Sequence, residues 1–147
     1  MSIEDDVALL ERVPTLRLLG NAALRTLAIG CEQRDFDRGK MLFTAGDEAD
    51  AGFVVQRGSF RISDGGGAEL VVGPGTLIGE LALVVAMSRP STAVALEHSS
   101  VIRIARSLFQ RVLESDPAAA LRLRDEFANR TSQIASDILM AGSKLNT

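Results

Sequence analysis

The residues best placed to do chemistry lie between Gly79 and Thr92, in the run Gly-Glu-Leu-Ala-Leu-Val-Val-Ala-Met-Ser-Arg-Pro-Ser-Thr. Glycine lets the backbone approach a ligand closely, and the Leu-Ala-Leu that follows suits one short helical turn. The first amides of such a turn have no partner inside it, so they point outward and favour an anion. Arg89 adds a planar cation that can hold two phosphate oxygens at once.

Glu80 puts a carboxylate beside this predicted anion site. Two neighbouring negative groups repel each other unless the carboxylate accepts from a donor of its own, such as a sugar hydroxyl. A surface ion pair would explain an isolated Arg and Glu, but the glycine and the turn favour a ligand site. One phosphate, one sugar hydroxyl and an apolar wall together describe a cyclic nucleotide.

The same stretch resembles the phosphate-binding cassette of the cyclic nucleotide-binding domain family. In that cassette a Gly-Glu-Leu-Ala-Leu run is followed, after a short loop, by Arg, a small residue, Ala and Thr. The spacing from Glu80 to Arg89 fits without a gap, and the resemblance extends upstream over residues 38–50 and 53–58.

The resemblance implies a role for each residue of the cassette. Arg89 would bind the exocyclic phosphate oxygens, and Glu80 would accept from the ribose 2′-hydroxyl. The amides of Leu81 and Ala82 would complete the phosphate cradle. The predicted ligand-binding residues are Gly79, Glu80, Leu81, Ala82, Arg89, Pro90, Ser91 and Thr92.

Pro90 departs from the family pattern, which has Ser, Ala or Thr at this position with an N–H that faces the phosphate. Proline has no N–H, so Ser91 or Thr92 would have to supply a hydroxyl instead. Members of the family that prefer cGMP tend to carry Thr directly after the arginine, which Pro90 cannot imitate. We therefore expect cAMP as the ligand.

An apolar wall and a lid would have to cover the base of the nucleotide. The predicted wall residues are Leu70, Val71 and Ile78, although ordinary core positions would explain each of them. In relatives the lid comes from the long C-terminal helix, where the corresponding residues are Thr131, Ile134 and Ala135.

The glycine pattern predicts a mainly β fold, an antiparallel β-roll of jelly-roll type with flanking helices. Ten of the 13 glycines lie between residues 32 and 104. They separate short apolar runs at 41–43, 52–55, 60–63, 70–72 and 101–104, with a hairpin turn at 64–67. We expect a single domain over residues 1–147: N-terminal helices to 31, the roll over 32–105 with the cassette at 78–92, and C-terminal helices over 106–147.

The C-terminal region predicts a short helix that ends before Asp116, then a long helix from Pro117 to about Met140. One stripe of this helix has the four-and-three spacing of an interhelical seam: Ala120, Arg124, Phe127, Thr131, Ile134, Ile138 and Ala141. The stripe predicts a weak homodimer contact. A helix that packs back on the roll would give the same pattern, and the two alternatives stay open.

Composition sets the expected class and partners. With a net charge of −3, the chain has no general attraction for nucleic acid or anionic lipid. One cysteine, an acidic N-terminus and the lack of an apolar run of about twenty residues predict a cytoplasmic protein that does not enter a membrane.

We expect a sensor domain that signals to a partner protein by repositioning its C-terminal helices, with no catalysis and no cofactor. A cupin-like enzyme would need several histidines, and the chain has one. The sensor part of a catabolite-activator-type transcription regulator would need a helix-turn-helix beyond Thr147, so we expect no direct nucleic acid binding. A third alternative is a protein interaction module that keeps the fold without binding a nucleotide, which Pro90 favours.

Overall fold

The computed structural model describes residues 2–126 and 128. In chain order its elements are α1 (Ile3–Glu11), α2 (Pro14–Arg17), α3 (Asn21–Gly30), β1 (Glu32–Phe36), β2 (Met41–Phe43), β3 (Glu48–Ala49), β4 (Ala51–Arg57), β5 (Phe60–Ser63), β6 (Glu69–Val72), β7 (Leu77–Ile78), the 3₁₀ turn η1 (Glu80–Leu83), β8 (Met87–Ser88), β9 (Thr92–Ala95), β10 (Ser99–Ala105) and α4 (Arg106–Ser115). Residues 117–126 and 128 are also helical.

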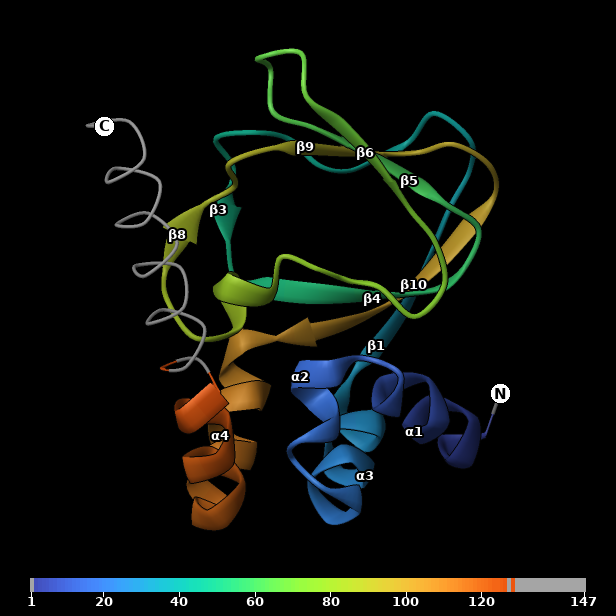
Figure 1. Ribbon diagram of the computed structural model, residues 1–147. Helices are drawn as coiled ribbons and strands as arrows, with labels where there is room; N and C mark the ends of the chain where they lie inside the picture. Colours follow the sequence, from blue (N-terminus) through green and yellow to red (C-terminus); the bar gives the residue numbers. More distant parts are fainter. Residues whose placement is uncertain (1, 127, 129–147) are drawn as a thin grey trace, which may run out of the picture.

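The strands form an antiparallel roll with the helices gathered on one side of it (Figure 1). In the described part of the chain, one sheet has the order β1-β10-β4-β7 and a second has the order β2-β9-β5-β6, while β3 pairs with β8. Figure 1 shows β4 and β10 next to the helices, and β5, β6 and β9 on the far side of the roll. The predicted fold class, a β-roll with flanking helices, is confirmed.

Strand β4 separates two hydrophobic cores because successive side chains on a strand point to opposite faces. Ala51, Phe53 and Val55 belong to the core inside the roll. Val54, between them, belongs to the core under the helices, where it joins Ile102 of β10. The predicted continuous apolar run of β4 is therefore buried on both faces.

The N-terminal helices begin at residues suited to the first turn of a helix. The side chain of Ser2 accepts a hydrogen bond from the Asp5 amide, 3.2 Å away, and so caps α1. Pro14 occupies the first turn of α2, where its missing N–H costs nothing. Leu10 and Leu24 are fully buried in the core that these helices share with α4.

The C-terminal segment follows the predicted break at the Asp-Pro pair. Asp116 ends α4, and its Oδ1 accepts from the Ala119 amide, 3.2 Å away, at the start of the next helical stretch. Of the predicted seam only Ala120 and Arg124 are described, and the others lie outside the described residues. Within the described part of the chain no helix has the length and apolar character needed to cross a membrane.

Gly58, between β4 and β5, lies where a side chain should destabilise the fold. Its φ is +83°, and a Cβ there would lie 2.7 Å from the Cα of Ser99, which is fully buried. Gly58→Ala should therefore lower the free energy of unfolding by about 2–5 kcal/mol, the sum of a left-handed backbone and a backbone clash. Urea denaturation measures the difference.

The matched control for Gly58 is Gly67 in the β5–β6 hairpin. Its φ is +92°, but a Cβ there would meet nothing within 4 Å. Gly67→Ala should therefore show only the backbone part, about 1–2 kcal/mol. Equal losses at the two positions would contradict the clash with Ser99.

Candidate functional site

A pocket of about 330 Å³ opens on the roll where the predicted cassette lies. Its lining residues are Phe43, Ile62, Leu70, Val72, Thr76, Leu77, Ile78, Gly79, Glu80, Leu81, Ala82, Met87, Arg89, Pro90 and Ser91. Strands β5 to β7 supply mainly apolar side chains, whereas η1 and the segment after β8 supply a carboxylate, a guanidinium and a hydroxyl. An apolar hollow with a few convergent polar groups is the usual form of a small-molecule site.

The cassette turn begins with Gly79, which has a left-handed backbone with φ +78°. A Cβ on this residue would lie 2.5 Å from Nη1 of Arg89, so glycine is needed for the guanidinium to approach the turn. The Ala82 amide donates to the Gly79 carbonyl at 3.1 Å and closes the turn. The amides of Ala82 and Leu81 are the two predicted cradle amides. The Ala82 amide is used inside the turn, whereas the Leu81 amide comes before this first hydrogen bond and is not used by the turn.

The backbone of Arg89 is held by the turn between β2 and β3. Its amide donates to the Asp47 carbonyl at 2.7 Å, and its carbonyl accepts from the Gly46 amide at 2.8 Å. These bonds continue the pairing of β3 with β8. The side chain therefore starts from a fixed point at the pocket wall.

The guanidinium of Arg89 is buried, with only 5% of the residue exposed. Nη2 donates to the Ala51 carbonyl at 2.8 Å, and the guanidinium carbon lies 4.3 Å from the ring centre of Phe43 and 5.3 Å from that of Phe53. Nε is buried and has no hydrogen-bond partner among the described residues. Aromatic faces attract a cation but do not neutralise it.

Burial lowers the pKa of Arg89, and the charge of Asp50 opposes this shift. The guanidinium nevertheless stays protonated, because its ordinary pKa lies far above neutral pH. Among the described residues no carboxylate forms an ion pair with Arg89; Asp50 is paired with Arg103 at 3.3 Å. A buried cation of this kind is a ready site for an anionic ligand.

Glu80 links the pocket to the N-terminal helices. Its Oε1 accepts a hydrogen bond from the Thr15 hydroxyl of α2, 3.0 Å away, and the residue also lines the pocket. The carboxylate therefore lies where a ligand hydroxyl in the pocket can reach it.

The three residues after Arg89 lie in different surroundings. Pro90 and Ser91 line the pocket. Thr92 is absent from the lining, and its Oγ1 accepts from the Ala45 amide at 2.9 Å. Ser91 is therefore the better placed of the two hydroxyls predicted to compensate for Pro90.

Only part of the predicted base wall faces the pocket. Leu70 and Ile78 line it, but Val71 does not. Neighbours on a strand point to opposite faces, so Leu70 and Val71 cannot both face the pocket. Val72, two residues after Leu70, lines the pocket as well. The predicted lid residues Thr131, Ile134 and Ala135 lie outside the described residues.

Several of the pocket residues were not predicted from the sequence, although the sequence contains a signal for two of them. Val72 follows from Leu70 by the strand period of two, and Ile62 pairs directly with Leu70 across the predicted hairpin. Phe43 and Phe53 carry no local signal, because their place beside Arg89 depends on the closure of the roll.

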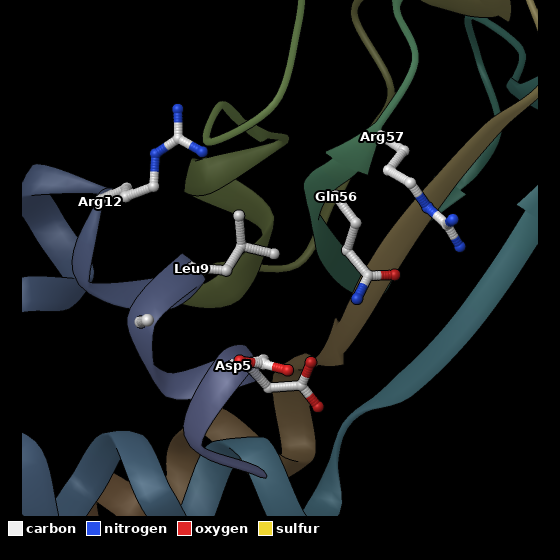
Figure 2. A pocket seen from close by; sticks show the side chains of 7 residues that line it. Asp5, Leu9, Arg12, Gln56 and Arg57 are labelled. Carbon is white, nitrogen blue, oxygen red and sulfur yellow. The ribbon is translucent and has the colours of Figure 1, made fainter. Parts of the chain in front are cut away.

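A second hollow of about 290 Å³ lies between α1 and the end of β4 (Figure 2). Figure 2 shows Arg12 at one side, Asp5 at the other and Leu9 between them, with Gln56 and Arg57 from β4 opposite the helix. Carboxylates and guanidinium groups face the same space. With no turn of outward amides and no single sign of charge, it does not have the chemistry of an anion site.

The remaining reactive side chains lie away from the pocket. Cys31 ends α3, and burial raises its pKa to about 11, so the thiol is a poor nucleophile. His98 is exposed, with Nδ1 3.1 Å from Asp37. In the part of the chain that the structure describes, no three potential metal ligands cluster together.

Two solved structures are similar to this chain over most of its length. A cyclic nucleotide-binding-like protein from Brucella abortus is 35% identical, with a TM-score of 0.67 over 75% of this chain and 98% of that one. The N-terminal domain of a transcriptional regulator from Streptomyces coelicolor is 28% identical, with a TM-score of 0.80 over 88% and 94%.

Curated relatives are far longer than this chain. The lysophospholipase NTE1 of Chaetomium globosum is 28% identical over 104 residues, which are 67% of this chain but 7% of that enzyme. The match thus covers one small part of the enzyme.

A family model settles the assignment. The model described as "cyclic nucleotide-binding domain" matches residues 33–116, more than half of the chain, and includes the whole pocket lining. The chain therefore belongs to the cyclic nucleotide-binding domain family.

Proposed function

We propose that this domain is a sensor for a cyclic nucleotide, that its ligand is cAMP, and that it carries out no catalysis. The observation that carries the proposal is the buried guanidinium of Arg89 at the pocket wall, which has aromatic and carbonyl neighbours but no ion-pairing carboxylate among the described residues. A cyclic phosphate has one negative charge and would complete this environment. Glu80 would then accept from the ribose 2′-hydroxyl.

The proposed signal leaves the pocket through α4. Arg106, the first residue of α4, donates through Nη1 to the carbonyls of Ala49 and Val85, each 2.9 Å away. Leu83 of η1 packs in the same core as Phe109 of α4. A ligand that shifts the cassette turn would therefore change which placement of α4 is favoured. The receiver would be a partner protein or a second copy of the chain.

The first prediction is that cAMP stabilises the domain. A ligand that binds only the folded state, at 100 times its Kd, adds about 2.7 kcal/mol. For a domain of this size that corresponds to a rise in Tm of about 5–10 °C. Thermal denaturation with cAMP, cGMP and 5′-AMP measures the effect, and we expect the largest rise with cAMP. Unchanged Tm values with all three would favour the interaction module.

Replacing Arg89 should separate binding from stability. Arg89→Met should weaken cAMP binding by about one to two decades, because a charge-assisted hydrogen bond contributes about 1.5–3 kcal/mol. The free energy of unfolding without ligand should stay within about 1 kcal/mol of wild type, because the apolar side chain also removes a buried charge. Calorimetry and urea denaturation give the two values.

The control for Arg89 is Arg61, an exposed arginine of the same roll. It neighbours Ile62, which faces the pocket, so its own side chain lies on the outer face. Arg61→Met should leave the cAMP affinity unchanged. A comparable loss in both variants would show that general charge, and not the Arg89 site, attracts the nucleotide.

Glu80 should act on the sugar and not on the phosphate. Glu80→Ala should weaken cAMP more than 2′-deoxy-cAMP, because the deoxy compound has no 2′-hydroxyl to donate. We expect the loss for cAMP to be about three- to tenfold, the value of one hydrogen bond. Calorimetry with both nucleotides tests this, and equal losses would refute the role given to Glu80.

A further inference from the structure

Helix α2 reaches the predicted ribose site through the buried side chain of Thr15. Thr15 is only 3% exposed, and its hydroxyl donates to Oε1 of Glu80 at 3.0 Å across 65 residues of sequence. An ionised carboxylate can only accept, so the threonine is the donor of this bond. Glu80 is thus contacted by α2 from one side and lines the pocket on the other.

We propose that Thr15 is a positioning residue for Glu80, and that it sets how strongly the site recognises the 2′-hydroxyl of the ligand. This inference rests on the proposed function. With Oε1 held by Thr15, the side chain of Glu80 loses rotational freedom before the ligand arrives. Pre-ordering of this kind raises affinity because less entropy is lost on binding.

The nature of residue 15 suits such a role. A β-branched residue has few χ1 rotamers, so a threonine hydroxyl is held in one direction better than a serine hydroxyl. Pro14 fixes the backbone just before it, at the start of α2. Burial of Thr15 limits the access of water to its hydroxyl.

A second contact ties the same corner of the helices to the strand that leads into the cassette. Arg12 Nη2 donates to the carbonyl of Pro74 at 3.3 Å. Residues 12–15 therefore contact both ends of the segment 74–80, which includes β7 and the first residue of η1. The position of Glu80 thus depends on the N-terminal helices as well as on the roll.

The test uses Thr15→Val in the full chain, with Thr15→Ser as the matched control that keeps the hydroxyl. Calorimetry with cAMP and 2′-deoxy-cAMP gives four affinities to compare with wild type. Thr15→Val should weaken cAMP by about three- to tenfold, the typical net value of one hydrogen bond, and 2′-deoxy-cAMP by less than about twofold, because the bond that positions Glu80 is lost. Thr15→Ser should change both by less than about twofold. If Thr15→Val does not fold, Thr15→Ala takes its place.

A double-mutant cycle with Glu80→Ala identifies the route of the effect. If Thr15 acts through Glu80, Thr15→Val should have no further effect on cAMP affinity once Glu80 is alanine. Equal losses for the two nucleotides, or additive losses in the cycle, would overturn the positioning role while cAMP binding by wild type stands. A wild-type protein that binds neither nucleotide would overturn the proposed function itself, and this inference with it.

Discussion

The geometry of the cassette depends on one buried charge, the guanidinium of Arg89. It is removed from water, and among the described residues no carboxylate forms an ion pair with it. The buried charge is tolerated because Phe43 and Phe53 offer ring faces and Ala51 offers a carbonyl. Gly79 has to lack a side chain so that Nη1 can approach the turn. A buried cation whose neighbours do not neutralise its charge favours the binding of an anion.

The cassette lies where the two cores of the domain meet, which explains how a pocket in the roll can influence the helices. Phe53 and Ile78 belong to the core inside the roll, while Leu83 belongs to the core under the helices. The segment from β7 to η1 therefore contacts both cores. A small displacement of η1 would be felt in the helical core, because close-packed interiors do not absorb volume changes locally.

Contacts from outside the roll complete the site. Thr15 of α2 donates to Glu80, and Arg106 of α4 donates to the carbonyls of Ala49 in β3 and of Val85 just after η1. Figure 1 shows α2 and α4 on the same side of the roll, next to β4 and β10. The helices thus cover the outer face of the sheet, and through Thr15 they also contact one polar group of the pocket, the carboxylate of Glu80.

The sequence alone determined the parts that depend on neighbouring residues. The turn at Gly79, the cation ten residues later, the short runs between glycines and the break before Pro117 are local patterns, and the structure has them. Only the tertiary structure decided which side chains meet: Phe43 and Phe53 at Arg89, Thr15 at Glu80, and Leu70 but not Val71 at the pocket. These contacts join segments far apart in the chain, and they depend on strand register and on the closure of the roll, which no local period encodes.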